Sequence, residues 1–360
     1  MAVDILPMSE DVCDDAAFLQ RLAAAWPELE AATLTPLEGG LLHRTWAVDA
    51  AAGAFILQRV AEAFSPDVHA NVEAVTAHLA AHGEPTLRLL RTAAGELLWR
   101  DGGADHRLMT RLPGTSFETC PSRAAARSAA AAMARFHSAL ADFDAPLAEL
   151  GFAYREPDRS FAALDAAVAA HGDHPFHAEV SELARRVAAA RAEWPALGDL
   201  PVRVIHGDPK FNNVLFVKDD GGHDVAHALV DLDTVLRRPL YHDLGDAWRS
   251  WCNRRPEDDP EAELDLDVFE ATAHGYREAL GFELTTVERV SFELALERIA
   301  LELAARFATD TLEETWFGWD ETRFPRSANH QCLRARGQLD LHDQARRARS
   351  TIREVLAATR

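Results

Sequence analysis

The sequence predicts an α+β fold of two lobes, in which a small strand-rich lobe precedes a larger helical one. The chain has 360 residues and is 48% hydrophobic, and single cores stop growing before about 300 residues. Short apolar runs separated by turns fill the first part of the chain, whereas helical periodicity dominates the rest. We therefore divide the chain after Leu112, into lobes of residues 1–112 and 113–360.

The first lobe is expected to alternate between strands and two helices. Apolar residues at helical spacing predict the helices, and alternating or β-branched runs bounded by turns predict the strands. Gly83 is a typical stop for the second helix. The predicted helices cover residues 14–32 and 67–82, and the predicted strands cover 34–49, 54–60, 88–99 and 105–112.

The second lobe reads as helical, with one exception. Residues 122–143 and 178–194 are predicted helices, and the chain is helical again from Asp243 onward. Between them, residues 202–235 contain short apolar runs broken by polar loops, which is typical of paired short strands.

Composition restricts the partners of this chain. The formal net charge is −21, whereas nucleic acid and anionic membranes require clustered Lys and Arg, so we expect neither as a partner. No apolar run reaches the roughly 20 residues of a membrane helix, and the acidic start does not resemble a signal peptide. The four cysteines are widely spaced, without a metal-binding or disulfide pattern. We expect a cytoplasmic protein.

The densest cluster of reactive side chains is the run HGDPKFNN at residues 206–213, followed by the apolar run that ends in Asp231. Phosphoryl transfer to a hydroxyl requires a carboxylate near the hydroxyl, oxygen ligands for magnesium and positive charge near the phosphoryl group. Asp208 can orient the hydroxyl or accept its proton, and Lys210 can offset developing charge. Asn213 and Asp231 can hold Mg²⁺. This is the order of groups in the protein-kinase catalytic loop.

Neighbouring residues are expected to support that loop. We expect His206 to tie it to nearby backbone, and Asp243 to steady it while capping the following helix. Asp233 is expected to support the metal ligands rather than bind the metal. Asp246 and Arg249 are one helical turn apart and are expected to form an ion pair.

The segments HGDPKFNNVLF, LVDLDTV and LYHDLGDAWR resemble the aminoglycoside phosphotransferase superfamily. Within it, the sequence is most similar to the N-acetylhexosamine 1-kinase type, which shares these motifs and a tail resembling residues 306–312. The resemblance implies a protein-kinase-like fold, with an N-terminal lobe for the nucleotide and a C-terminal lobe for catalysis and the acceptor. It implies ATP with Mg²⁺ as cofactor and a small-molecule acceptor, above all the anomeric hydroxyl of an N-acetylhexosamine or related sugar.

Other functions stay open at this point. The acceptor could instead be an aminoglycoside, a homoserine-like molecule or an amino alcohol, and the acidic composition favours a cationic molecule. A protein of another class, one that binds nucleotide without catalysis, would also carry many of these residues.

The resemblance also implies contacts in the nucleotide lobe. Gly39 and Gly40 lie in a turn expected over the nucleotide phosphates, where glycines let backbone N–H groups approach an anion. The family has a basic residue on the next strand, held by a helix acid, but Gln58 occupies that position here. We predict that Arg59 serves instead, paired with Glu73.

For the acceptor, the resemblance points to Arg306, whose guanidinium could donate hydrogen bonds to sugar oxygens. The alternative is that Arg306 only forms an ion pair with Asp310, one helical turn away. Together with Asp208, we expect Phe317 to contact the acceptor as an apolar wall beside Trp316.

Overall fold

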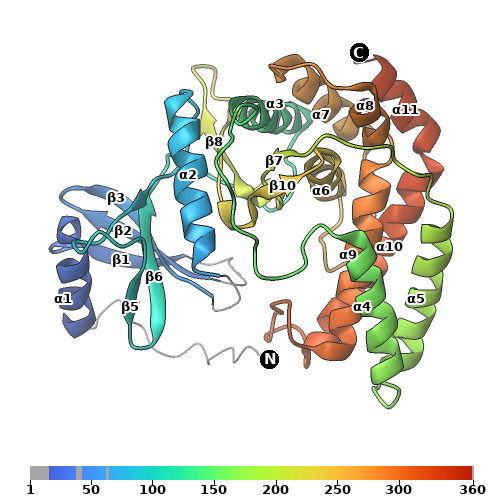
Figure 1. The fold of residues 1–360 in the computed structure, drawn as a ribbon, viewed down its shortest axis with the longest axis horizontal. Coiled ribbons are helices and arrows are strands. Elements are labelled where there is room, and N and C mark those ends of the chain that lie inside the picture. Colours follow the sequence, from blue (N-terminus) through green and yellow to red (C-terminus); the bar gives the residue numbers. More distant parts are fainter. Residues whose placement is uncertain (1–15, 38–42, 62–64, 359–360) are drawn as a thin grey trace.

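The structure is a computed structural model that describes residues 16–37, 43–61 and 65–358. Figure 1 shows a twisted sheet on one side of the molecule and a larger group of helices on the other. The predicted α+β fold of a strand-rich lobe followed by a helical lobe is therefore confirmed. The expected division after Leu112 falls just beyond the last strand of the sheet.

The N-terminal lobe is built on an antiparallel sheet of six strands, in the order β1-β2-β3-β6-β4, with β5 also paired to β6. Its elements are α1 (Ala16–Ala25), a 3-10 turn η2 (Pro27–Leu29), β1 (Thr33–Leu37), β2 (Arg44–Ala50), β3 (Gly53–Arg59), β4 (Leu89–Leu90), β5 (Trp99–Asp101) and β6 (Ala104–Thr110). Helix α1 covers one face of the sheet and buries Phe18 and Leu22 against Trp46 and Leu57. The predicted strand over 88–99 is wrong in its middle, because the chain turns at Gly95.

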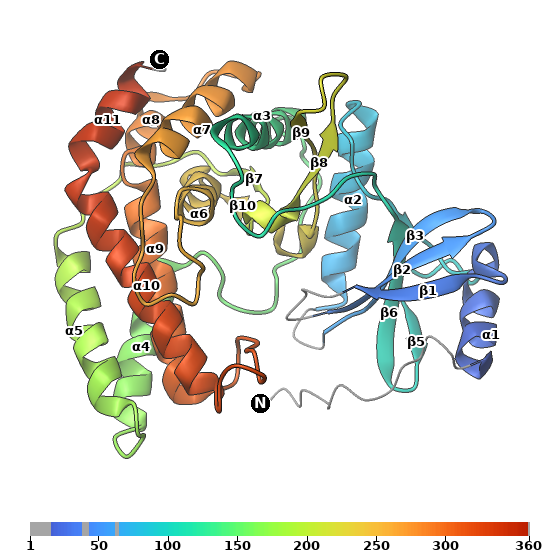
Figure 2. The same cartoon turned by 180° about the vertical axis from the view of Figure 1, so that it is seen from behind.

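Helix α2 (Asp67–Ala81) belongs to the first lobe in sequence but contacts both lobes. Its apolar side chains Val68, Val72, Val75 and Leu79 are spaced for one helix face. They lie in the same buried cluster as Met133 and other side chains of the C-terminal lobe. Figures 1 and 2 show α2 standing between the sheet and the helical lobe. A shift of α2 would therefore change the packing of both lobes.

The C-terminal lobe combines helices with two short antiparallel ladders, β7–β10 and β8–β9. The helices are α3 (Arg123–Ala139), α4 (Pro157–Ala170), α5 (His177–Ala192), α6 (Tyr241–Trp251), α7 (Leu266–Ala279), α8 (Thr286–Phe292), α9 (Ala295–Glu313), α10 (Ser327–Arg347) and α11 (Arg349–Ala358). The strands are β7 (Arg203–Ile205), β8 (Val214–Lys218), β9 (Asp224–Leu229) and β10 (Leu236–Arg238). The predicted helices over 122–143 and 178–194 and the short strands are confirmed, and α4 is an additional helix. The expectation of helix from Asp243 onward holds only in part, because non-helical segments separate α6 from α7, α7 from α8 and α9 from α10.

Helix α9 is the centre of this lobe and contacts α4, α5, α6 and α10. Gly245 of α6 allows one close contact, because a Cβ atom there would lie 2.4 Å from the carbonyl oxygen of Ala295. The glycine thus brings the backbone of α6 directly against α9. None of the helices within the described ranges is both long and apolar enough to cross a membrane.

Candidate active site

The predicted catalytic loop connects β7 to a short 3-10 turn, η3 (Phe211–Asn213). Gly207 has a φ of +89°, and a Cβ atom there would lie 2.3 Å from the carbonyl oxygen of Thr234. Glycine is therefore required for the loop to lie against the segment after β9. The Gly207 carbonyl accepts hydrogen bonds from Tyr154 Oη at 3.0 Å and from Arg155 Nε at 3.0 Å.

Asp243 and His206 hold the loop in place through hydrogen bonds, as the sequence predicts. The Asp243 carboxylate accepts hydrogen bonds from the backbone N–H groups of His206 at 2.7 Å and Gly207 at 2.8 Å. It also lies 2.9 Å from His137 Nε2. His206 Nε2 donates to the Val230 carbonyl at 2.9 Å. Asp243 sits in the first turn of α6, whereas the N-cap position is Leu240, so its support goes to the loop rather than to the helix cap.

Asp208 and Lys210 face each other across the loop, with Asp208 Oδ2 3.0 Å from Lys210 Nζ. Burial opposes ionisation of Asp208, but the positive charges of Lys210, Arg249 and Arg155 outweigh it and hold the pKa of Asp208 below its usual value. The negative charge of Asp208 in turn raises the pKa of Lys210. Both side chains are therefore charged at neutral pH.

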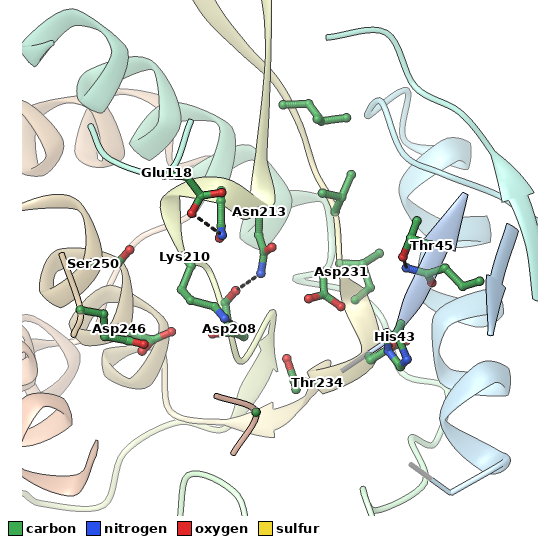
Figure 3. A pocket seen from close by; sticks show the side chains of 18 of the residues that line it. His43, Thr45, Glu118, Asp208, Lys210, Asn213, Asp231, Thr234, Asp246 and Ser250 are labelled. Carbon is green, nitrogen blue, oxygen red and sulfur yellow. Dashed lines mark hydrogen bonds and ion pairs between the residues drawn. The ribbon is translucent and has the colours of Figure 1, made fainter. Parts of the chain in front are cut away.

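Asn213 and Asp231 bring their oxygen atoms to the same cleft (Figure 3). Asn213 Nδ2 donates to the Asp208 carbonyl at 2.8 Å, which leaves its side-chain oxygen available as a ligand. Asp231 follows β9 with a left-handed backbone (φ 63°, ψ 60°), a conformation that Asp tolerates better than most residues.

The Asp231 carboxylate opens onto the cleft, yet the surrounding protein removes much of its hydration. This loss, together with the negative charges of Asp233 and Asp208, raises the pKa of Asp231. A nearby cation would relieve that repulsion.

Asp233, in the 3-10 turn η4 (Leu232–Thr234), joins the two lobes. It accepts hydrogen bonds from Arg107 Nη1 at 2.5 Å and Nη2 at 2.7 Å, and its Oδ2 is 2.7 Å from His43 Nε2. Burial opposes its ionisation, but these cationic and hydrogen-bonding partners lower the pKa of Asp233. Its carboxylate is thus already engaged, which fits the expected supporting role.

Arg107 has no donor left over for another ligand in this arrangement. Besides Asp233, its guanidinium donates to Gln58 Oε1 from Nε at 2.9 Å and from Nη2 at 2.6 Å, and its Nη1 lies 3.2 Å from His69 Nδ1. Five N–H groups therefore meet five contacts. Arg107 is 3% exposed, so the pair with Asp233 is a buried ion pair between β6 and the metal-ligand segment.

The predicted ion pair of Arg59 with Glu73 in the nucleotide lobe is wrong. Glu73 accepts hydrogen bonds from Arg91, at 3.0 Å from Nε and 2.6 Å from Nη2, rather than from Arg59. Gln58 lines the cleft, and side chains alternate along a strand, so Arg59 on β3 points to the other face of the sheet. The two glycines of the expected phosphate turn, Gly39 and Gly40, lie outside the described residues.

The far end of the cleft is formed by α9 and the segment that follows it. The guanidinium carbon of Arg306 lies 5.0 Å from the ring centroid of Tyr154 and 5.2 Å from that of Phe317. Asp310 accepts hydrogen bonds from the backbone N–H groups of Thr315, Trp316 and Phe317 at 2.8–2.9 Å. The alternative that Arg306 only pairs with Asp310 is therefore wrong: Asp310 holds the aromatic segment, and Arg306 lines the cleft.

A network of buried ion pairs lies next to this end of the cleft. The expected pair of Asp246 and Arg249 is present at 2.7 Å, and Asp246 also binds Arg155 at 2.8 Å. Glu257 accepts hydrogen bonds from Arg249 at 2.5 Å and from Arg334 Nε at 3.1 Å. The opposing charges of both arginines outweigh burial and lower the pKa of Glu257.

Sequence reasoning missed several of these residues. No role was predicted from the sequence for Tyr154, Arg155, Glu257, Arg334 or Arg107. Tyr154, Arg155 and Arg107 come from segments distant in sequence from the motifs, whereas Arg334 lies in the tail of the resemblance without an assigned role. The one available signal was a charged residue, Arg107, in the middle of a predicted strand that otherwise reads as buried.

Residues of both lobes line one cleft of about 1130 Å³. Ordinary ligand pockets measure about 300–1,000 Å³, so this cleft has room for a nucleotide and a small acceptor together. Asp208, Lys210, Asn213 and Asp231 all line it, as do Arg306 and Phe317.

The chain is similar in sequence to proteins of known activity. The sequence pattern of the phosphotransferase enzyme family matches residues 33–282. A homoserine kinase of Methylobacterium nodulans is 29% identical over 229 residues, which are 59% of this chain and 62% of that protein. A homoserine kinase of Methylobacterium radiotolerans is 27% identical over 213 residues, 58% of this chain and 60% of that protein. The matched segments thus span less than two thirds of these relatives.

Solved structures share the fold at low sequence identity. A microcompartment-associated aminopropanol kinase superposes with a TM-score of 0.62 at 16% identity, covering 94% of this chain and 99% of that one. An amicoumacin kinase in complex with AMP-PNP and Ca²⁺ superposes with a TM-score of 0.59 at 13% identity, covering 92% and 94% of the two chains. At these identities the likeness concerns the fold alone.

Proposed function

The chain belongs to the phosphotransferase enzyme family, and from that premise we propose that it transfers the γ-phosphoryl group of ATP to a hydroxyl of a small molecule. One observation carries the proposal. Asp208, Lys210, Asn213 and Asp231 converge on a single cleft that has room for both substrates. A carboxylate, a cation and two oxygen ligands are the groups that such a transfer needs.

Asp208 is proposed to orient the acceptor hydroxyl and to accept its proton. Its lowered pKa keeps it ionised, and an ionised carboxylate at hydrogen-bond distance is the requirement for a general base. Lys210, 3.0 Å away, is proposed to stabilise the negative charge of the transferred group. The proton moves from the hydroxyl oxygen to the Asp208 carboxylate as the new oxygen–phosphorus bond forms, and the bond between the γ-phosphorus and its bridging oxygen breaks, so that ADP leaves.

The donor set at Asn213 and Asp231 fits Mg²⁺, because both present oxygen atoms and Asp231 is an open carboxylate in an electronegative setting. A bound Mg²⁺ would supply charge neutralisation at the β- and γ-phosphates. Asp231→Ala should weaken magnesium-dependent nucleotide binding more than Asn213→Ala does, because the carboxylate contributes charge as well as an oxygen. Calorimetric titration of nucleotide with and without Mg²⁺ tests this ranking, and equal losses would contradict it.

On the nucleotide side, Arg107 is proposed to act as a positioning residue. It holds Asp233 in place at 2.5–2.7 Å, and Asp233 stands two residues after the proposed metal ligand Asp231. Because its donors are already engaged, Arg107 supports the metal segment rather than binding phosphate itself. The expected roles of Gly39, Gly40 and Arg59 as phosphate contacts stay predictions.

For the acceptor, a reducing sugar phosphorylated at its anomeric hydroxyl is the first candidate. Arg306 lies between two aromatic rings in the cleft, and among the described residues no acid accepts a hydrogen bond from it. A guanidinium held in this way can donate to several oxygens of one ligand. The adjacent Phe317 and Trp316 would pack against the apolar face of a sugar ring.

A homoserine-like acceptor is the second candidate, and the two homoserine kinases among the relatives favour it. Arg306 could bind a carboxylate with two parallel hydrogen bonds. The hydroxyl of such an amino acid would then reach Asp208 from the same end of the cleft.

A panel of acceptors with magnesium and ATP separates these candidates. We expect ADP release that depends on one acceptor class: N-acetylhexosamines, homoserine, aminoglycosides or amino alcohols. If methyl glycosides react as fast as the free sugars, the anomeric position is wrong and the kinase assignment stands. If nucleotide binds but no acceptor supports turnover, the protein is a nucleotide-binding protein without this catalysis.

A further inference from the structure

The C-terminal end of α2 carries two histidines one helical turn apart, and an aspartate from the turn after α3 faces both. The rings of His78 and His82 stack with centroids 4.3 Å apart. Asp142 Oδ1 is 3.0 Å from His78 Nε2, and Asp142 Oδ2 is 3.6 Å from His82 Nε2. All three ligand atoms lie within 4.8 Å of one another. Ligands at 2.0–2.2 Å from a tetrahedral metal are roughly 3.3–3.6 Å apart, so this trio needs little adjustment to enclose one.

The tautomer of the neutral His82 ring directs an acceptor nitrogen toward Asp142. His82 Nδ1 is 2.9 Å from the carbonyl oxygen of His78, and a carbonyl can only accept. Nδ1 therefore carries the proton, and in the neutral ring Nε2 presents its lone pair toward the Asp142 carboxylate. Two acceptors facing each other repel, and either a proton on Nε2 or a metal cation between them removes this repulsion. A histidine that donates its second nitrogen to a backbone carbonyl is the usual arrangement at metal sites.

The surroundings hold the three ligands in place. The C-terminal end of a helix concentrates partial negative charge, which favours a cation there. His78 packs edge-to-face on Phe143 with ring centroids 5.2 Å apart. Arg237 Nη2 donates to the carbonyl oxygens of Phe143 at 2.8 Å and Ala145 at 3.1 Å, which fixes the turn that carries Asp142.

We propose that His78, His82 and Asp142 bind a divalent transition metal ion of the Zn²⁺ class. Two imidazoles and one carboxylate suit Zn²⁺, and water can complete the coordination. The all-oxygen site of Asn213 and Asp231 suits Mg²⁺ instead, so the two sites differ in chemistry. A bound ion ties α2 to the turn after α3 and thereby braces the helix that packs against both lobes.

Zn²⁺ titration of the full chain in excess Mg²⁺, by calorimetry and by thermal unfolding, tests the proposal. The variants are His82→Ala and Asp142→Asn, which change side chains at the surface. The matched control is His223→Ala, because His223 is also an exposed histidine beside an aspartate, Asp219, but has no second histidine near it in that pair.

We expect the unchanged chain and His223→Ala to bind one more Zn²⁺ than His82→Ala, with a thermal stabilisation by Zn²⁺ that His82→Ala lacks. Asp142→Asn should bind that ion at least about tenfold more weakly, in the range that loss of a supporting metal-site group causes. Equal stoichiometry and affinity in all four proteins would overturn the proposal, as would Co²⁺ spectra unchanged by His82→Ala. Neither readout depends on turnover.

Discussion

The two sides of the cleft are built in opposite ways. On the catalytic side, Asp208, Lys210 and Asn213 lie within six consecutive residues, and their mutual contacts are local. On the nucleotide side, His43 and Arg107 come from separate segments and contact Asp233 from the other lobe, while Gln58 accepts hydrogen bonds from Arg107. Arg107 and Asp233 are 126 residues apart in sequence.

This difference separates reactive groups from the groups that place them. The catalytic side supplies charges and ligands whose order follows from the chain itself. The nucleotide side supplies a buried ion pair that fixes one lobe against the other, and only one of its partners, Asp233, lies in a sequence motif. Substitutions on the catalytic side should therefore affect turnover, whereas those on the nucleotide side should affect stability first.

The largest effect is expected from Asp208→Asn. Losing a positioned base should lower kcat by about 10²–10⁴-fold, while nucleotide affinity and thermal stability stay close to those of the unchanged chain. Steady-state kinetics and calorimetry measure the two separately. Asp219→Asn, the same chemical change in the exposed turn between β8 and β9, is the control. Near-normal turnover in Asp208→Asn would remove the contrast between the two sides.

Arg107→Met is expected to act mainly on stability. It leaves the buried Asp233 with only His43, and breaking a buried ion pair costs about 3–5 kcal/mol. Urea unfolding measures the loss. The double variant Arg107→Met with Asp233→Leu should recover much of it, since no buried charge is then unpaired. If Arg107→Met lowers kcat as strongly as Asp208→Asn but leaves the free energy of unfolding unchanged, Arg107 belongs with the catalytic groups.

Arg306→Ala sharpens the comparison at the acceptor end. Loss of hydrogen bonds from a charged donor should cost about 1.5–3 kcal/mol, seen as a rise of about tenfold or more in the KM of the acceptor. The KM of ATP should not change. A lower Tm with unchanged acceptor KM would instead give Arg306 a structural role.

The smallest effect is expected from Arg91→Ala. Its pair with Glu73 lies at the surface, with the Arg91 side chain 50% exposed, and such pairs contribute about 1 kcal/mol at most. The KM of ATP should stay the same in Arg91→Ala and in Glu73→Ala. A large increase in ATP KM for Glu73→Ala alone would return Glu73 to the nucleotide site.

The amino-acid pattern was enough to predict the two-lobed fold and to single out residues 206–213 as the candidate catalytic loop. Hydrophobic periodicity distinguished strands from helices because each pattern repeats over a few neighbouring residues. The loop could be interpreted for the same reason: between His206 and Asn213, spacing along the chain limits which side chains can meet. The supporting role of His206 followed from its place in this loop, whereas that of Asp243 became clear from the hydrogen bonds that its carboxylate accepts from the loop N–H groups.

Ion pairs between different elements depended on the tertiary structure, whereas the pair of Asp246 and Arg249 within α6 followed from their spacing. Glu73 was predicted to pair with Arg59, but in the structure it pairs with Arg91. Side chains alternate along β3, which turns Arg59 away, and β4 leads the chain directly into Arg91. Asp310 lies one helical turn after Arg306 on α9, a spacing that allows an ion pair. In the structure its carboxylate instead accepts hydrogen bonds from three backbone N–H groups that follow the end of the helix. Periodicity describes one element at a time, whereas an ion pair between elements depends on how two of them pack. That packing brings Arg107 to Asp233 and His82 to Asp142.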